Sequence, residues 1–200
     1  MIYKLLQNIA ALSNAMKVRL SPAINRFHFK SNGIVVGKGL WVLGKISIIG
    51  SGKIIIGDNF CMTSGEHINP ISANMQASFY TDSPDAQIRI GDNVGMSSTR
   101  IWIHEGLTIG NNVKIGGGVL LIDTDCHPID YSVRRSSNEG TCSAPIIIEN
   151  DVWIGAQSII LKGVTIGARS IIGAGSVVTN SIPADCIAAG NPCKVVKKLC

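Results

Sequence analysis

Residues able to do chemistry are concentrated in one short polar segment of the sequence. His127 lies there between Asp125 and Asp130, shortly after Asp123. A neighbouring carboxylate or carbonyl group can fix the tautomer of a histidine and leave its other ring nitrogen free to act as a base near neutral pH. We therefore predict a general base at His127 and include Asp125 in the candidate catalytic site. Two roles stay open for Asp123 and Asp125, namely orienting His127 or capping the loop.

Cys126 offers an alternative chemistry, in which its thiol is a nucleophile. Adjacent side chains point to opposite sides of an extended chain, so Cys126 and His127 are poorly placed to share a proton. We therefore favour general-base catalysis over a covalent thioester mechanism.

These residues are positioned by a six-residue repeat. No helix has this period, and a simple strand repeats every two residues. Glycine follows several of the repeated residues, which is typical of a chain that turns a corner every six residues. Each aliphatic side chain is then expected to lie inside, against the one eighteen residues away, in a three-sided parallel β-helix. The repeated residues are Ile103, Ile109, Ile115, Leu121, Ile154, Ile160, Ile166, Ile172 and Val178.

Asparagine and aspartate tolerate a left-handed backbone, and they occur in pairs where corners are expected. The pairs are Asp58-Asn59, Asp92-Asn93, Asn111-Asn112 and Asn150-Asp151. The sequence thus predicts an all-β solenoid.

Three regions follow from the pattern. Residues 1–30 form an N-terminal helical cap, in which an amphipathic helix over residues 1 to about 20 ends at Pro22 and covers the open end of the prism. A weak membrane-surface contact through residues 1–20 is the alternative role of this helix. Residues 31–186 form the β-helix, with 67–84 as a bulging loop and 123–145 as a protruding loop, and 187–200 form a C-terminal tail.

The composition narrows the function classes. The chain has 200 residues, 46% of them hydrophobic, and a net charge of +5, which is compatible with one solenoid domain. Basic residues are not interleaved with aromatic ones, so we expect no nucleic-acid partner. The six cysteines lack metal-binding spacing, and the sequence shows no secretion signal or transmembrane-length apolar run. We therefore expect a cytoplasmic protein with reduced thiols and no metal.

Several motifs resemble those of the hexapeptide-repeat acyltransferases. They are His127-Pro128, the block 152–156, the blocks 163–167 and 173–179, and the ending 188–196. The resemblance is dense over about half of the chain, from residue 109 to 199, and is greatest to galactoside and maltose O-acetyltransferases and their relatives in surface-polysaccharide synthesis.

The resemblance implies a left-handed β-helix, an exception to the usual right-handed crossover, and a homotrimer with active sites between neighbouring prisms. It also implies that acetyl-CoA is the co-substrate and that His127 is the catalytic base. The implied acetyl-CoA contacts are Trp153 near the thioester, Gly155, Ala156 and Ala174 along the pantetheine arm, Thr179 further along the groove, and Lys194 and Lys197 near the phosphates.

The chain departs from the family pattern at three places. Ser98 stands where galactoside-type enzymes carry an asparagine, and it can still donate to the acceptor or to the oxyanion. Asn180 replaces a lysine that often follows the threonine at 179. The N-terminal segment also differs, which favours a polysaccharide acceptor over free galactosides or maltose.

The sequence therefore predicts transfer of an acetyl group from acetyl-CoA to a hydroxyl of a sugar or a surface-polysaccharide precursor. Segments 62–88 and 128–145 are expected to contact the acceptor, and the length of the acyl group stays open. The alternatives are N-acetylation of a nucleotide amino sugar, O-acetylation of serine, a metal-dependent β-helix enzyme using His67, His104 and His127, and a non-catalytic assembly protein.

Overall fold

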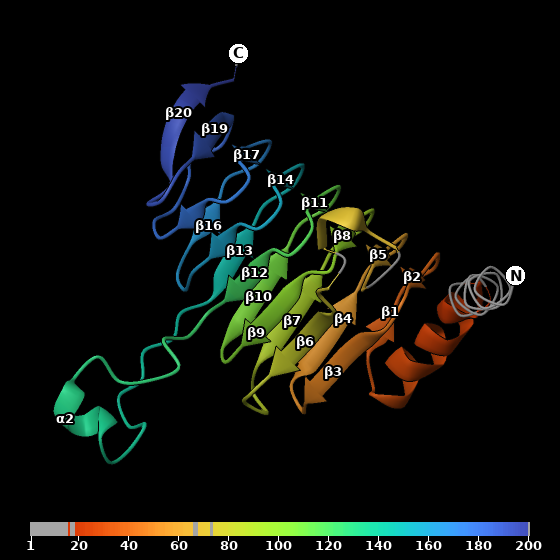
Figure 1. The fold of residues 1–200 in the computed structure, drawn as a ribbon, viewed down its shortest axis with the longest axis horizontal. Helices are drawn as coiled ribbons and strands as arrows, with labels where there is room; N and C mark the ends of the chain where they lie inside the picture. Colours follow the sequence, from red (N-terminus) through yellow and green to blue (C-terminus); the bar gives the residue numbers. More distant parts are fainter. Residues whose placement is uncertain (1–15, 17–18, 66–67, 73, 200) are drawn as a thin grey trace, which may run out of the picture.

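The repeats fold into a three-sided prism of stacked coils (Figure 1). The computed structural model describes residues 16, 19–65, 68–72 and 74–199. Each regular coil adds one strand to each of three sheets, here named A, B and C, which the chain visits in that order. The edges of the prism are named the A/B, B/C and C/A corners after the sheets that they join. The fold is the left-handed parallel β-helix that the sequence predicts.

The strands of each sheet stack in chain order. Sheet A contains β1 (Val35–Val36), β4 (Lys53–Ile56), β7 (Gln87–Ile90), β10 (Gly106–Ile109), β13 (Ile146–Ile148) and β16 (Thr165–Ile166). Sheet B contains β2 (Trp41–Leu43), β5 (Cys61–Thr63), β8 (Gly95–Ser97), β11 (Lys114–Ile115), β14 (Trp153–Ile154), β17 (Ile171–Ile172), β19 (Cys186–Ala189) and β20 (Lys194–Lys198). Sheet C contains β3 (Ile46–Gly50), β6 (Ala77–Thr81), β9 (Arg100–Ile103), β12 (Leu120–Ile122), β15 (Ile159–Ile160) and β18 (Val177–Val178).

The repeated aliphatic side chains fill the interior of the prism. Ile154 is paired with Ile172, and Ile160 with Val178, in adjacent parallel strands. All four side chains are fully buried. Burial of each such side chain stabilises the fold by about 1.5–3 kcal/mol relative to an exposed position. The prediction that each aliphatic residue lies against the one eighteen residues away is therefore confirmed over residues 154–178. In the earlier coils the spacing differs, since Ile115 pairs with Met96 and Leu121 pairs with Ile101.

The paired Asn and Asp residues form a ladder along the A/B corner. The second residue of each pair has a left-handed backbone, with φ of 56° at Asn59, 58° at Asn93, 60° at Asn112 and 61° at Asp151. Their side chains are linked from coil to coil, because Asn59 Nδ2 donates to Asn93 Oδ1 at 3.0 Å and Asn93 Nδ2 donates to Asn112 Oδ1 at 3.2 Å. The first residues of the pairs form a parallel ladder, in which Asp92 Oδ1 accepts from the backbone N–H of the preceding coil. The expected corner role of these pairs is confirmed.

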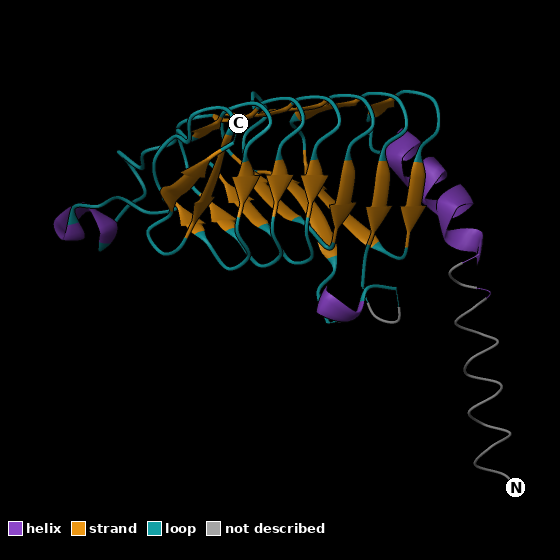
Figure 2. Cartoon of the chain, turned by 90° about the horizontal axis from the view of Figure 1, so that it is seen from above, coloured by secondary structure: helices purple, strands orange, loops and turns teal. Residues whose placement is uncertain are grey.

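The N-terminal helix differs from the prediction, since it does not end at Pro22. Residues 19–31 are helical, whereas residues 1–15 and 17–18 of the expected helix lie outside the described residues. Proline removes one helical hydrogen bond, but packing on the first coils holds the segment in place. Asn25 Nδ2 donates to the carbonyl groups of Val42 and Gly44, both at 2.8 Å, and Phe29 is fully buried. The helix lies at the N-terminal end of the stack (Figure 2).

Two other boundaries also differ from the prediction. Strand β6 takes up part of the expected loop 67–84, so the excursion is limited to the residues between β5 and β6, with the short 3₁₀ helix η1 (Pro70–Ser72). The expected tail 187–200 is not irregular, because β19 continues sheet B and β20 pairs with it in an antiparallel hairpin. None of the helices in the described part of the chain has the length and hydropathy needed to span a bilayer.

Replacing Asn93 tests the corner ladder. We expect Asn93→Ala to lower the free energy of unfolding by about 1–3 kcal/mol, because it removes two side-chain hydrogen bonds and places a Cβ-bearing residue without local hydrogen bonding in the left-handed region. Asn93→Gly removes the same bonds without the backbone strain, so it should cost about 1 kcal/mol less. Urea denaturation measures both. Equal losses for alanine and glycine would show that the backbone conformation is not the source of the effect.

Candidate active site

The predicted protruding loop leaves the prism at the C/A corner, between β12 and β13. Its two ends are held together by an antiparallel bridge between Thr124 and Ser143 and by a hydrogen bond from Asp125 N to Cys142 O at 3.0 Å. Beyond this base the chain projects away from the body and contains the one-turn helix α2 (Tyr131–Arg134) (Figure 1). The expected departure from the repeat over 123–145 is therefore confirmed.

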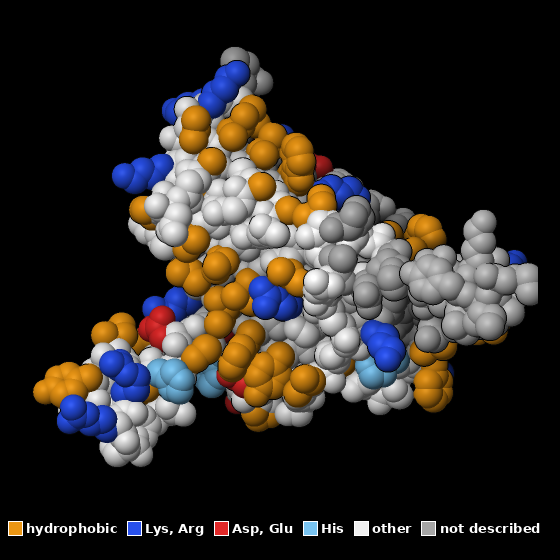
Figure 3. Space-filling view, viewed as in Figure 1, with side chains coloured by type: hydrophobic (Ala, Val, Ile, Leu, Met, Phe, Trp, Pro, Cys, Tyr) orange, Lys and Arg blue, Asp and Glu red, His pale blue; other side chains and the backbone are white. Residues whose placement is uncertain are grey.

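The outer part of the loop exposes apolar and cationic side chains together. Ile129 and Tyr131 are both exposed, and the guanidinium of Arg135 lies 5.2 Å from the Tyr131 ring centroid. Arg134 Nη1 donates to the carbonyl groups of Pro128 and Ile129 and so ties the helix to the segment that follows His127. Hydrophobic and Lys or Arg side chains lie side by side on the loop in Figure 3. Such a mixed surface suits contact with a partner or substrate better than open solvent.

His127 is exposed near the base of this loop, and its ring has one side-chain partner among the described residues. Nδ1 of His127 lies 3.2 Å from Oδ1 of Asn138. An amide oxygen only accepts, so Nδ1 carries the proton and Nε2 keeps a free lone pair. This is the tautomer that a general base needs. Asn138 was not predicted, and no sequence signal identifies it, because the loop fold brings it back across eleven residues.

The two aspartates before His127 have structural partners instead. Asp123 is fully buried, and its carboxylate accepts from the backbone N–H groups of His104, Glu105 and Gly106 at 2.7–2.8 Å. Burial is the largest influence on this carboxyl and raises its pKa above the usual value, against the opposing effect of the three N–H groups. Asp123 thus caps the corner of the preceding coil, a role that differs from the two left open by the sequence.

Asp125 forms an ion pair with Lys162, with 2.9 Å between Oδ1 and Nζ. Lys162 follows β15, one coil above the loop, so this pair ties the loop to the next coil. In the described chain, Asp125 is not brought into contact with the His127 ring, whose partner is Asn138. The predicted catalytic grouping of Asp125 with His127 therefore has no direct contact within one chain.

Cys126 has the environment of an inert thiol. Its backbone φ is 63°, and its side chain is half-buried. Burial raises the pKa of the Cys126 thiol, and the negative charges of Asp82 and Asp125 raise it further. Since the thiolate is the nucleophilic form, this environment disfavours the alternative in which Cys126 attacks a substrate.

A second histidine at the C/A corner has a carboxylate partner. Nδ1 of His104 lies 2.9 Å from Oδ1 of Asp82, and the other carboxylate oxygen of Asp82 accepts from Trp102 Nε1 at 2.8 Å. Glu105 accepts from Ser143 Oγ at 2.7 Å and so contacts the returning end of the loop. The sequence identified His104 and Glu105 only as an outward pair; their link to Asp82 and Ser143 depends on the stacking of three coils.

Ser98 lies at the B/C corner, away from the loop. It precedes β9, whereas the loop follows β12, and these strands are parallel with Arg100 opposite Leu120. The two positions are therefore at opposite ends of sheet C, which a four-residue strand spans over about 13 Å. Ser98 is fully buried with φ of 43°, and its Oγ accepts from Gly65 N at 3.3 Å. One chain does not bring Ser98 and His127 together.

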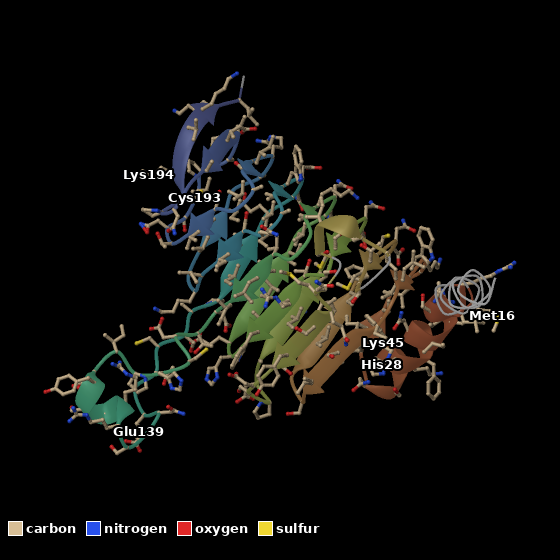
Figure 4. The ribbon with its side chains drawn as sticks, viewed as in Figure 1. Met16, His28, Lys45, Glu139, Cys193 and Lys194 are labelled. Carbon is tan, nitrogen blue, oxygen red and sulfur yellow. The ribbon has the colours of Figure 1, made fainter. Side chains whose placement is uncertain are left out.

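The predicted acetyl-CoA contacts are distributed over the outer face of sheet B, the B/C corner and the C/A corner. Trp153 is exposed on the outer face of sheet B, and the residues after it turn the B/C corner. A Cβ at Gly155 would lie 2.5 Å from Ala174 N, so the corner backbones of successive coils approach closely there. Thr179 is exposed at the C/A corner, next to Asn180. Lys194 and Lys197 are exposed on β20, which extends sheet B beyond Trp153 (Figure 4).

The histidines proposed for a metal site are not grouped. His104 and His127 each have their own side-chain partner, and His67 lies outside the described residues. The described part of the chain contains no group of three His, Cys, Asp or Glu side chains arranged to hold a metal ion.

Replacing Asp123 tests its structural role. We expect Asp123→Asn to lower the free energy of unfolding by about 1–3 kcal/mol, because the amide NH₂ group would face a backbone N–H and leave it unpaired in a buried site. Asp125→Asn is the matched control and should cost less than about 1 kcal/mol, since it weakens only one partly exposed ion pair. Thermal and urea unfolding of both variants measure these losses. A greater loss for the Asp125 variant would contradict the assignment.

Comparison with known proteins agrees with the repeat pattern and the fold. Residues 145–180 match the family model described as bacterial transferase hexapeptide (six repeats), and residues 87–122 match the hexapeptide repeat of succinyl-transferase. The galactoside O-acetyltransferase of Escherichia coli strain K12 is 47% identical over 93 residues, which cover 46% of this chain and 44% of that protein. The chain thus spans less than half the length of this curated relative.

Two solved structures extend the similarity over most of the fold. A galactoside acetyltransferase in complex with coenzyme A is 28% identical with a TM-score of 0.58, over 94% of this chain and 80% of that one. An N-acyltransferase from Bacillus cereus, solved with dTDP-4-amino-4,6-dideoxyglucose and coenzyme A, has a TM-score of 0.62 at 21% identity, over 88% of this chain and 89% of that one, and shows the fold alone. With the repeats and the prism described above, the family-model matches and the galactoside acetyltransferases support a hexapeptide-repeat acetyltransferase.

Proposed function

We propose that this protein is an acetyl-CoA-dependent O-acetyltransferase that acts on a hydroxyl of a sugar or a surface-polysaccharide precursor. The observation that carries the proposal is His127, exposed at the base of the loop, with Nδ1 held by Asn138 and Nε2 free. The similarity to galactoside O-acetyltransferases supports acetyl-CoA as donor and a sugar hydroxyl as acceptor.

In the proposed mechanism, Nε2 of His127 removes the proton of the acceptor hydroxyl while that oxygen attacks the thioester carbonyl of acetyl-CoA. The proton then passes from the imidazolium to the departing thiolate of coenzyme A. Asn138 keeps the imidazole in the required tautomer throughout, and its neutral amide does so without adding charge. Backbone N–H groups at the B/C corner are the proposed donors to the oxyanion, because the nearby hydroxyl of Ser98 is fully buried and does not reach a substrate. Holding both substrates in one cleft supplies much of the remaining acceleration.

This site requires a second copy of the chain, because its proposed parts lie at opposite ends of sheet C. The outer face of sheet C carries a registered apolar row, formed by Ile49, Tyr80, Trp102 and Ile122 in four successive strands. Tyr80 and Trp102 are also stacked, with 5.0 Å between their ring centroids. We propose that this face packs on neighbouring copies in a homotrimer. The loop of one subunit, with His127, then meets the B/C corner of the next, with Ser98, Trp153 and the glycine-rich turns.

The proposed acetyl-CoA track runs from the B/C corner towards β20. The exposed indole of Trp153 and the small residues Ala156 and Ala174 leave room for a narrow chain beside the corner. The ammonium groups of Lys194 and Lys197 are three strands further along sheet B, about 14 Å at the usual strand spacing. A pantetheine arm and its phosphates fit this order of small residues followed by cations.

Calorimetric titration of coenzyme A and acetyl-CoA tests the donor without knowledge of the acceptor. We expect micromolar affinity that falls about tenfold in Lys194→Ala and falls further with added salt, because a phosphate contact is lost or screened. Lys53→Ala is the matched control, since Lys53 is exposed on sheet A, away from the proposed track. No heat at millimolar coenzyme A would exclude the proposed activity.

Acetyl transfer to saccharide acceptors tests the base. We expect His127→Ala to lower kcat by about 10²–10⁴-fold while coenzyme A affinity stays within about twofold. Asn138→Ala should lower kcat less and change its pH profile, whereas Asn138→Asp, which still accepts from Nδ1–H, should retain more activity.

Alkaline treatment of the product identifies the bond formed, because an ester is cleaved and an amide is not. Near-normal turnover of His127→Ala would overturn the assignment of the base. An alkali-stable product would favour the N-acyl alternative.

A further inference from the structure

We infer that the N-terminal end of the prism is a docking surface for an anionic lipid bilayer. The described helix, residues 19–31 with Met16 before it, uses one face to pack on the prism and leaves a second, apolar face uncovered. The packed face carries Asn25 and Phe29, whose contacts with the first coils are described above. The uncovered face consists of Met16, Leu20, Ile24 and Phe27.

These four side chains form one stripe. Their spacing of four, four and three residues places them within a narrow sector of a helix that advances about 100° per residue. Their exposed fractions are 63% at Met16, 54% at Leu20, 61% at Ile24 and 74% at Phe27. Four large apolar side chains in a row are more than the scattered exposed residues of an ordinary soluble surface. The stripe therefore requires an apolar environment to cover it.

The charges around the stripe identify that environment. Arg19, Arg26 and Lys30 are exposed on one flank of the stripe, at positions that follow from the same helical spacing. Residues 1–57 contain no Asp or Glu but eight Lys and Arg, whereas the rest of the chain carries all thirteen acidic residues and the other ten basic ones. The first coils add the exposed cations Lys38, Lys45 and Lys53 to this end of the prism, where Figure 4 marks Lys45 and Met16.

An anionic bilayer satisfies both features at once. The apolar stripe can enter the boundary between headgroups and acyl chains, while the flanking cations meet the lipid phosphates, as in amphipathic helices that lie in a membrane plane. A second copy of the chain is a poorer occupant, because its corresponding surface carries the same positive charge and would repel it.

The docking geometry also fits the proposed function, on which this step rests. In sheet A, four strand spacings separate β1 from β13, so the base of the loop would lie about 19 Å above the N-terminal coil. In the proposed trimer all three helices lie at the same end, and their binding would be multivalent. The acceptor hydroxyl would then belong to a glycan carried at the membrane surface.

Co-sedimentation with vesicles tests the surface directly and needs no acetyl transfer. We expect the full chain to bind phosphatidylcholine vesicles that contain about 30% phosphatidylglycerol. This binding should be at least about tenfold tighter than binding to vesicles of phosphatidylcholine alone, because each Lys or Arg near an anionic surface adds to the binding free energy. Binding should weaken as salt rises.

Two variants with matched controls separate the apolar from the charged contribution. Ile24→Glu should lower vesicle binding by at least about tenfold, whereas Ile129→Glu, which places the same charge on another exposed isoleucine, should not. The double variant Arg19→Gln/Arg26→Gln should reduce binding to the anionic vesicles. The double variant Arg134→Gln/Arg135→Gln lowers the net charge of the protein by the same amount and should not reduce binding. Circular dichroism and coenzyme A titration check that each variant is folded.

Three results would overturn the inference. They are no binding to the anionic vesicles, equal binding by Ile24→Glu and the wild type, and a fall in the mass measured by light scattering on Ile24→Glu, which would make the stripe an interface between copies. Failure of coenzyme A binding would overturn the proposed function and leave the vesicle result unaffected.

Discussion

The stacking of one coil on the next is the constraint on which the rest of the structure depends. Because parallel strands lie about 4.8 Å apart, the backbone conformation at the corners cannot vary much from coil to coil. Each corner therefore needs a residue that accepts a left-handed backbone or lacks a Cβ. At the A/B corner this requirement produces the Asn and Asp ladder, and at the B/C corner it produces close approaches such as that of Gly155 to Ala174. The identical repeat of backbone positions then places side chains with the same role in columns along each face.

The proposed base lies where the chain leaves this regular stack. The loop departs at the C/A corner without leaving the preceding coil unpaired, because the buried carboxylate of Asp123 accepts the three backbone N–H groups of residues 104–106. A carboxylate suits this position, since it accepts several N–H bonds where an amide or hydroxyl group would offer fewer oxygen lone pairs. The same corner thus combines a structural acid with an exposed base four residues later. Their closeness in sequence reflects the exit from the prism and not a shared proton.

The sequence was sufficient to predict the prism, because a six-residue period has one structural solution and its inward residues are fixed by register. Ile154 and Ile172 are predictable in this way, and so are Asn93 and Asn112. The partner of His127 was not, because Asn138 reaches it through the particular path of an irregular loop. The helix end at Pro22 was predicted wrongly. The contacts of Asn25 and Phe29 with the first coils stabilise the helix more than the low helix propensity of proline destabilises it. A local sequence pattern therefore predicts the features that recur in every coil. It does not predict a contact that one loop or helix makes only once.

The division of the proposed site between two edges follows from the same geometry. In a prism, residues on one face share a direction, whereas a reaction between two large substrates needs groups that converge from different directions. One chain cannot supply this convergence across sheet C, because its strands hold Ser98 and the His127 loop at opposite ends. In the proposed trimer, packing of sheet C against another copy would bring the loop of one subunit to the B/C corner of its neighbour. The apolar row of Ile49, Tyr80, Trp102 and Ile122 would supply the contact. Assembly and catalysis would then depend on the same face, so that a separated subunit would keep its fold and lose its cleft.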